Sequence, residues 1–296
     1  MILNISGRTD IVAFYSDWFM KRLEEGFVDV RNPFYPKLVS RINFDDVDLL
    51  FFCTKNPIPI LDKIKKIKKK VYFHITLTGY KKDIEPNLPP KNEIIEAIKK
   101  LSKIIGKENI VIRYDPVFIS DKYTLEYHVK AFDKICDLLD GYTNKILISF
   151  LDEYKNVKNN RKIINYKVLT EHDYETIGRS FSESARKHGM VVHTCFEQRN
   201  LVEYGFVKDE CMSRELALKL TGKEFKEEWK ARKEKLCHCV SMVDIGDYNS
   251  CRHFCKYCYA NYDEKIVNDK YKQHNPNSSL LIGQLHDDDI IKERKK

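Results

Sequence analysis

Three cysteines lie close together near the end of the sequence, in the segment CRHFCKYCYAN at residues 251–261. They are Cys251, Cys255 and Cys258, and they follow a Cys-x3-Cys-x2-Cys spacing. Three thiolates from one loop can bind three irons of a 4Fe–4S cluster and leave the fourth iron open for a substrate or cofactor. The pair Cys255-x2-Cys258 could instead join Cys237-x-Cys239 in a zinc site of four thiolates. The spacing alone leaves iron–sulfur and zinc about equal and places disulfides behind both.

The other six of the nine cysteines fall into two groups. Cys136 lies on the helical pattern KAFDKICDLL and is expected in the core, and Cys53 is interpreted as a small buried hydrophobic residue on a strand. The remaining four equal one complete ligand set for a second 4Fe–4S cluster or a structural zinc. These four are Cys195, Cys211, Cys237 and Cys239. The alternative is that Cys195 and Cys211 are merely buried.

The composition is that of a globular protein, with 43% hydrophobic and 32% charged residues among 296. Clustered cysteines in a reducing compartment usually bind metal or do redox chemistry. The sequence has no apolar run of about 18 residues and no signal-peptide pattern at MILNISGRTD, so we expect a cytoplasmic protein without membrane contact. The net charge of +8 permits an anionic substrate or nucleic acid but requires neither.

Six short apolar runs punctuate the first 200 residues and predict the elements that position these side chains. Most of the runs are continuous rather than alternating, which is typical of parallel strands buried on both faces. Helical patterns separate them, and repeated strand–helix alternation predicts βαβ units. The strand runs are residues 2–6, 47–53, 71–78, 109–114, 145–150 and 190–196, and the helical patterns are residues 11–26, 57–70, 90–106, 124–141 and 171–189.

We therefore predict an α/β fold, a partial (β/α)6 TIM-type barrel, with a doubly wound open sheet as the alternative. Residues 1–210 form the barrel in this prediction. Residues 211–296 form a cysteine-rich, cluster-binding extension that folds over the barrel mouth. From about residue 263 the tail is polar, and we expect it to be frayed and solvated.

The spacing of Cys251, Cys255 and Cys258, with Tyr257 just before the last cysteine, resembles the signature of the radical S-adenosylmethionine (SAM) superfamily. The resemblance implies that these cysteines bind a 4Fe–4S cluster and that SAM chelates its fourth iron. It further implies reductive cleavage of SAM to methionine and a 5′-deoxyadenosyl radical, a full or partial (β/α) barrel, and an electron donor such as a flavodoxin or ferredoxin. Tyr257 would pack beside the adenine of SAM.

Most superfamily members carry this signature near the start of the barrel, whereas here it follows all six predicted strands. The chain more closely resembles a bacterial domain-of-unknown-function family with a C-terminal radical-SAM-like cysteine cluster. A distant similarity to spore photoproduct lyase-like proteins is analogy only, and no repair residues are visible. The closer resemblance rests on the order of SGRTDI (6–11), TKNP (54–57), RYDP (113–116), TCFE (194–197), CHCVSMVDIGDYNSC (237–251), CKYCYAN (255–261) and HNPNSSLLIG (274–283).

Polar residues at the carboxyl ends of the predicted strands are candidates for cofactor binding, because barrel enzymes place their chemistry there. Arg8, Lys55 and Arg113 could bind carboxylate or phosphate, and one could hold the SAM carboxylate. The alternative is that Arg8–Asp10 and Arg113–Asp115 pair as structural salt bridges. The full set of candidates with Tyr257 is Arg8, Lys55, Asn56, Thr78, Arg113, Asp115 and Glu197.

Two functions from different classes follow. The first is a radical SAM enzyme that starts radical chemistry on an unknown substrate, with no catalytic residue predicted beyond the cluster. The second is a zinc-stapled nucleic-acid-binding or structural module without catalysis.

Overall fold

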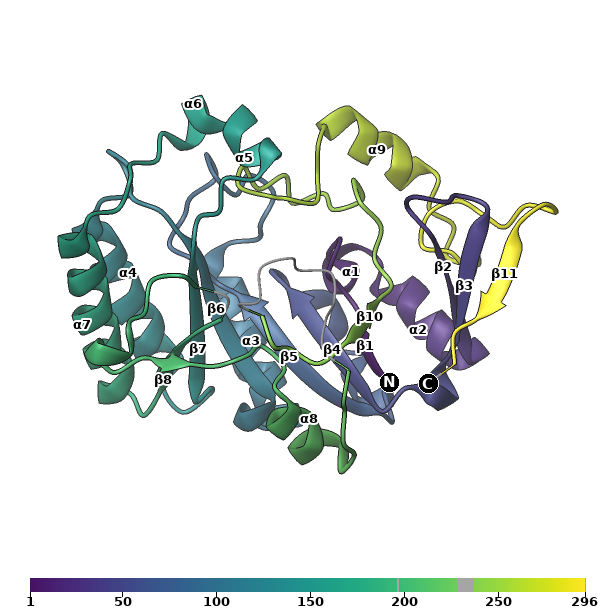
Figure 1. Ribbon diagram of the computed structural model, residues 1–296, viewed down its shortest axis with the longest axis horizontal. Helices are drawn as coiled ribbons and strands as arrows, with labels where there is room; N and C mark the ends of the chain where they lie inside the picture. Colours follow the sequence, from purple (N-terminus) through teal and green to yellow (C-terminus); the bar gives the residue numbers. More distant parts are fainter. Residues whose placement is uncertain (196, 228–236, 296) are drawn as a thin grey trace.

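The computed structural model describes residues 1–195, 197–227 and 237–295. Its main feature is an eight-stranded sheet of order β10-β1-β4-β5-β6-β7-β8-β9, in which every neighbouring pair is parallel (Figure 1). In the described residues the two edge strands do not pair with each other, so the sheet stays open. The strands are β1 (Ile2–Asn4), β4 (Leu49–Thr54), β5 (Lys70–Thr76), β6 (Ile110–Val117), β7 (Lys145–Phe150), β8 (Val191–Thr194), β9 (Val207–Lys208) and β10 (Met242–Asp244).

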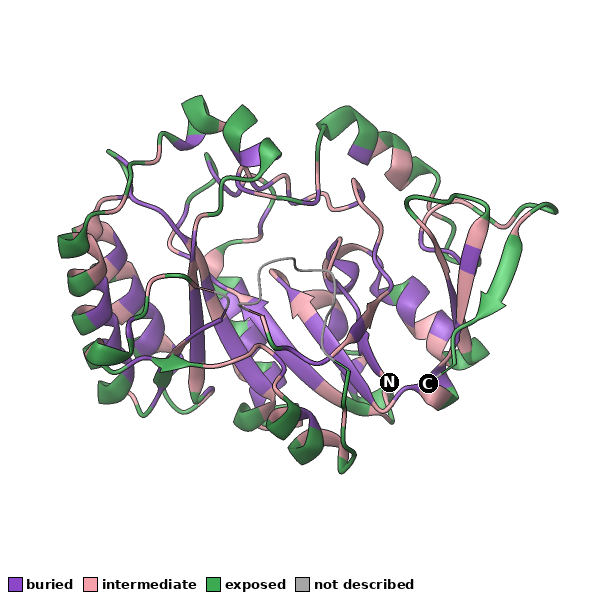
Figure 2. Cartoon of the chain, in the orientation of Figure 1, coloured by how far each residue is buried: buried purple, intermediate pink, exposed green. Residues whose placement is uncertain are grey.

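All six predicted strands are present, as β1, β4, β5, β6, β7 and β8. Their continuous apolar runs are explained by burial on both faces. One face, with Leu50, Phe73 and Ile112, packs in the large core with the helices. The other face, with Leu49 and Tyr72, belongs to a second buried cluster. Figure 2 shows the strands buried and the outer faces of the helices exposed.

Most helices cover one face of the sheet or its ends, and α8 packs against the opposite face through Ala217 (Figure 1). Local signals set several of their ends: Gly26 ends α2 with a φ of +86°, and Thr170 starts α7 with a reciprocal capping box. Helices α4 and α7 pack through Phe132 and Phe181, whose rings stack with centroids 3.8 Å apart. The helices are α1 (Ile11–Phe14), α2 (Ser16–Glu25), α3 (Lys91–Ile105), α4 (Leu125–Leu138), α5 (Lys155–Asn159), α6 (Arg161–Ile164), α7 (Glu171–Lys187), α8 (Arg214–Thr221) and α9 (Glu264–Lys272).

The helix predicted over residues 57–70 is wrong. The chain there makes two short 3-10 turns, η2 (Ile58–Ile60) and η3 (Ile64–Lys66), which bury Ile60 and Ile64. Pro57 and Pro59 lack amide hydrogens. The lysines that follow would also repel one another at helical spacing. The helical spacing of the isoleucines therefore reflects burial of residues in two turns rather than one face of a helix.

The expectation of a frayed tail is also wrong. Residues beyond 263 form α9 and then β11 (Ile290–Glu293), which pairs in parallel with β3 (Leu38–Asn43). The antiparallel partner of β3 is β2 (Phe27–Arg31), so the tail completes a second, three-stranded sheet. The indole N–H of buried Trp18 donates to the Ser278 carbonyl at 2.8 Å. Tertiary pairing therefore orders a segment whose polar composition predicts solvation.

No helix among the described residues is long and apolar enough to cross a membrane.

Candidate metal centre

A cavity of about 650 Å³ lies at the carboxyl ends of the strands. It is lined by the charged strand-end residues Arg8, Lys55, Arg113, Asp115 and Glu197, which lie on or just after four of the strands, β1, β4, β6 and β8. Strand β10 joins β1 in the sheet, so the C-terminal segment continues directly from the sheet into the wall of this cavity. All cysteines of both predicted sets line it, together with Cys53: Cys195, Cys211, Cys237, Cys239, Cys251, Cys255 and Cys258.

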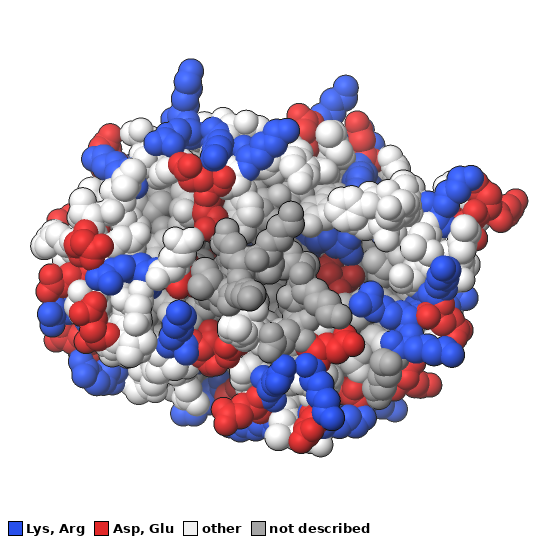
Figure 3. All heavy atoms as spheres, viewed as in Figure 1, with Lys and Arg blue, Asp and Glu red and all other residues white. Residues whose placement is uncertain are grey.

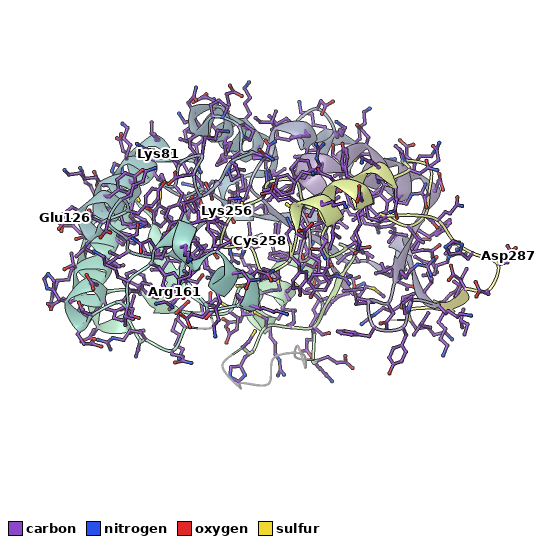
Figure 4. The ribbon with its side chains drawn as sticks, turned by 90° about the horizontal axis from the view of Figure 1, so that it is seen from above. Lys81, Glu126, Arg161, Lys256, Cys258 and Asp287 are labelled. Carbon is purple, nitrogen blue, oxygen red and sulfur yellow. The ribbon has the colours of Figure 1, made fainter. Side chains whose placement is uncertain are left out.

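Residues 251–258, here called the cysteine loop, are attached to the fold from several sides. Asn160 donates to the Lys256 carbonyl at 2.7 Å, and Asn87 donates to the Arg252 carbonyl at 2.8 Å. The Lys256 amide donates to the Ile84 carbonyl at 2.9 Å. Asn156 donates to the Asn261 carbonyl at 2.6 Å, just beyond the loop. Seen from above, Cys258 lies near the middle of the molecule with Lys256 close by (Figure 4).

Among the loop cysteines, Cys255 is buried, and Cys251 and Cys258 are half-buried. Burial raises the pKa of Cys255 to about 12 and raises those of Cys251 and Cys258 as well. A metal would favour the thiolates, because metal binding displaces thiol protons. Phe254 has a φ of +56°, so the backbone of the loop includes a left-handed residue between two of its cysteines.

Asp10 fixes the first part of the loop to the sheet. Its carboxylate accepts from the His253 ring at 2.9 Å, from the Thr54 hydroxyl at 3.0 Å and from the Lys55 amide at 2.8 Å. Both Asp10 and His253 are buried. The alternative pairing of Arg8 with Asp10 does not form, because Asp10 accepts from His253 of the loop and Arg8 pairs with Asp244.

Glu85 fixes the second part of the loop. This carboxylate is 1% exposed and accepts from Lys55 at 3.0 Å, from Thr78 at 3.0 Å, and from Lys91 and the Tyr257 hydroxyl at short range. Burial alone would raise the pKa of Glu85, but Lys55 and Lys91 outweigh it and lower that pKa to about 2. Lys55 also donates to the Tyr257 hydroxyl at 2.7 Å. Tyr257, which directly precedes Cys258, is thus held by a buried network of charged side chains.

A second group of sulfur atoms is more compact. The Sγ atoms of Cys195, Cys211 and Cys239 all lie within 4.8 Å of one another, so this triad could bind a metal ion. Hydrogen bonds from the Cys195 and Cys239 thiols, with the nearby Arg113 guanidinium, hold the pKa of Cys211 well below its ordinary value. The hydrogen bond to Cys211 raises the pKa of Cys195 to about 12. One alternative from the sequence was a zinc site that joins Cys237 and Cys239 to Cys255 and Cys258. The structure corrects it, because Cys239 lies with Cys195 and Cys211 instead.

Arg113 and Asp115 form the salt bridge that the sequence analysis gave as an alternative. The Arg113 Nε–H donates to Asp115 at 2.9 Å, and another guanidinium nitrogen lies 3.7 Å from Cys211 Sγ. Asp115 also accepts from the Ser149 hydroxyl at 3.4 Å. The same guanidinium nitrogen lies 3.4 Å from His74 Nδ1, and burial lowers the pKa of His74 to about 3. Arg113 therefore contacts both Asp115 and Cys211 at the wall of the cavity.

Arg8 pairs with a residue that the sequence analysis did not select. Its Nε–H donates to Asp244 at 2.9 Å, and a second nitrogen donates to the Asp244 carbonyl at 3.1 Å. A Cβ at Gly7 would lie 1.7 Å from Asp244 Oδ2, so only glycine fits there. Asp244 ends β10, and this pair links the first and the last strand of the sheet.

The other predicted residues have different surroundings. Glu197 lines the cavity and accepts from the Phe150 amide at 3.0 Å, and burial together with Asp152 and Asp115 raises its pKa to about 8. Asn56 and Thr78 do not line the cavity. The Asn56 side chain accepts from the Ile58 amide at 3.1 Å and holds a turn, while Thr78 bonds to Glu85.

The chain was compared with protein families and with curated proteins. The family described as "Domain of unknown function (DUF1848)" matches residues 2–260. The chain belongs to this family. No curated protein matches it.

The DUF1848 match contains both thiol groups and ends just after the cysteine loop, whereas α9 and β11 lie beyond it. Within the matched region, sequence reasoning missed Glu85, Asp244 and the cavity position of Cys53. The segment KKDIEPN around Glu85 reads as an ordinary polar loop. Only tertiary contact with two lysines makes that carboxylate important. Asp244 follows just two apolar residues, too short a run to predict a strand.

Proposed function

We propose that this protein is a radical SAM enzyme whose 4Fe–4S cluster is bound by Cys251, Cys255 and Cys258. One observation carries the proposal. The three loop thiols line the same cavity as the charged residues at the carboxyl ends of the parallel strands. In α/β sheets this edge is where ligands bind. The cavity volume of about 650 Å³ is in the range of small-molecule sites.

The donor set fits such a cluster. Three thiols come from one loop, and the His253 ring between the first two of them bonds to Asp10 through Nε2. Three thiolates leave one iron for a non-protein ligand. When bound, such a cluster supplies the electron that cleaves SAM to methionine and a 5′-deoxyadenosyl radical. The electron itself would come from a donor such as a flavodoxin or ferredoxin.

The strand order favours a partial barrel over a doubly wound sheet. From β1 through β4, β5, β6, β7 and β8 the order in the sheet follows the order in the chain. A doubly wound sheet instead reverses its order at a switch point. We therefore propose that these six strands are the wall of an incomplete (β/α)6 barrel, with β10 added beside β1.

The roles of the chain's own residues follow from their contacts. Glu85, Lys55 and Tyr257 orient the loop, and Asp10 with His253 fixes its start. Arg8, Lys55 and Arg113 each line the cavity and each already contacts a carboxylate. We assign the carboxylate of SAM to one of these cations, where it would compete with Asp244, Glu85 or Asp115.

The nucleic-acid module has less support. On the face shown in Figure 3, the Lys and Arg side chains that the structure describes are interspersed with Asp and Glu. A nucleic-acid surface is expected to gather basic side chains on one face or along one groove.

The proposal is tested by anaerobic purification and reconstitution with iron and sulfide. We expect a brown protein whose broad visible absorption is perturbed by SAM and which forms 5′-deoxyadenosine under reducing conditions. Cys255→Ala should abolish 5′-deoxyadenosine formation, because only two loop thiolates would remain. Cys53→Ala is the matched control, since Cys53 lines the same cavity outside the loop, and it should retain cleavage.

A wild-type protein that holds no iron after reconstitution would contradict the proposal. Cleavage that survives in Cys255→Ala would contradict the assignment of the loop.

A further inference from the structure

We propose that Cys195, Cys211, Cys237 and Cys239 bind a single zinc ion in a tetrahedral site of four thiolates, separate from the cysteine loop. The proposal does not depend on the function proposed above. It selects one of the two alternatives that the sequence left open for these cysteines, a second cluster or a single ion.

The spacing of the sulfur atoms decides between them. The Sγ atoms of Cys195, Cys211 and Cys239 lie within 4.8 Å of one another. With zinc–sulfur bonds of about 2.3 Å, the corners of a tetrahedron are about 3.8 Å apart, so three sulfurs in this arrangement can share one ion. Thiolates of a 4Fe–4S cluster each bind a different iron and therefore stand farther apart. The compact triad fits one ion and is too tight for a cluster.

Cys237 completes the set. It lines the same cavity, packs against the same buried cluster as the triad, and its thiol interacts with that of Cys239. Four thiolates close the coordination sphere of zinc and leave no open position, which is the pattern of structural rather than catalytic zinc.

Backbone hydrogen bonds hold the segments that carry the ligands beside one another. Cys195 directly follows β8, and the Asp209 amide donates to the Thr194 carbonyl at 3.1 Å, which holds the Cys211 segment beside that strand. The Val240 amide donates to the Met212 carbonyl at 3.0 Å, which holds the residue after Cys239 beside the residue after Cys211. Three separate segments of the chain thus converge on one place.

Arg113 contributes to balancing the charge of the site. A zinc ion with four thiolates carries a net charge of −2, which is unfavourable in a buried place unless cations or hydrogen-bond donors face it. The Arg113 guanidinium lies 3.7 Å from Cys211 Sγ, within reach of an N–H···S contact. Such outer contacts orient thiolate ligands and stabilise their charge.

The site would tie the C-terminal segment to the sheet. Cys239 lies three residues before β10, and the cysteine loop follows β10. A zinc ion shared with β8 and the Cys211 segment would fix the entry into β10, and through it the loop that lines the cavity. Its role is therefore to position the loop rather than to take part in its chemistry.

The test uses the full chain with all three loop cysteines changed to alanine, which removes the proposed cluster. We expect about one zinc per chain to remain bound through dialysis against a weak chelator. Changing Cys211 and Cys239 to serine in addition should remove the zinc, and Cys53→Ser in the same background should retain it. Cys53 is the matched control because it lies in the same cavity but outside the triad.

A spectroscopic measurement on the wild-type chain covers the case in which the double variant fails to fold. X-ray absorption at the zinc edge should give sulfur scatterers only, at about 2.3 Å, with no neighbouring metal. Iron with iron neighbours in the triple loop variant would overturn the proposal in favour of a second cluster. A chain free of metal, or a disulfide among the four cysteines, would also overturn it. Zinc without any iron in the reconstituted wild type would overturn the radical SAM function alone.

Discussion

Single side chains at this cavity are defined more by their tertiary partners than by their neighbours in sequence. The cysteines could be selected from the sequence because thiols are rare and their spacing is informative, and Cys136 is buried in the core as predicted. Glu85 could not, because a carboxylate in a polar loop is ordinary until two lysines and a tyrosine enclose it. The Arg8–Asp244 pair joins residues from opposite ends of the chain, and no local pattern predicts such a pair.

The burial of Glu85 gives a prediction for stability. Glu85→Gln would leave Lys55 and Lys91 without their carboxylate in a buried place, so we expect a loss of about 3–5 kcal/mol in the free energy of unfolding. Urea denaturation monitored by circular dichroism measures it. Glu175→Gln, in an exposed pair with Arg179, is the control and should cost less than about 1 kcal/mol. Equal losses in the two variants would contradict the structural weight given to Glu85.

At the scale of elements, the sequence predicts what is regular and buried. Six strands were found because continuous apolar runs in this chain mark strands covered on both sides. The hairpin of β2 and β3 was missed, since its charged residues interrupt the apolar pattern, and β10 is only three residues long. The proline- and lysine-rich turns after β4 imitate a helix in their periodicity alone. Boundaries and short edge strands depend on partners that the local sequence does not contain.

The junction of β6 and α4 gives a prediction for pH dependence. His128 on α4 accepts from the Tyr114 hydroxyl at 2.8 Å and donates to the Phe118 carbonyl at 2.9 Å, and burial lowers its pKa from 6.5 to about 4. Between these pH values the unfolded chain binds a proton that the folded chain does not, so stability falls as the pH falls. The shift corresponds to about 3 kcal/mol.

The variant His128→Gln can keep both hydrogen bonds without titrating, and its loss of stability between pH 6.5 and pH 4 should be smaller than that of the wild type. Urea midpoints at several pH values measure the difference. His172→Gln, on the exposed start of α7, serves as the control and should follow the wild type. Parallel pH profiles for the wild type and His128→Gln would show that the buried ring does not carry this dependence.

At the scale of the whole molecule, the last part of the chain holds the first part in place. The Tyr15 hydroxyl donates to the Ser250 carbonyl at 2.6 Å. Leu280 forms an isolated parallel β-bridge with Asp29 of β2. Both chain ends lie on the same side of the molecule (Figure 1). Composition alone could not reveal this, because a polar tail becomes ordered only through partners contributed by residues 15–43.

Two truncations test how the tail contributes. Removing residues 285–296 deletes β11 and the Arg31–Asp289 pair, which are exposed or half-buried, and we expect a fall in Tm of only a few degrees. Removing residues 274–296 also deletes buried Ser278, Leu280 and Leu281, and it should lower the Tm by more than twice as much. Differential scanning calorimetry measures both. The same small effect from both cuts would mean that the tail is not part of the core.

The register of Ile2 beside Met242 has a consequence for biosynthesis. Strand β1 takes its place between β4 and β10, and β10 is made after all the other strands of this sheet. Until then one edge of β1 has no partner, and the cysteine loop does not yet exist. The proposed cluster could therefore be assembled only after residue 258 has been made, whereas all four ligands of the proposed zinc site precede β10. A chain that ends before residue 251 would contain β10 and the four cysteines of the proposed zinc site but no cysteine loop, so it could bind the zinc without the proposed cluster.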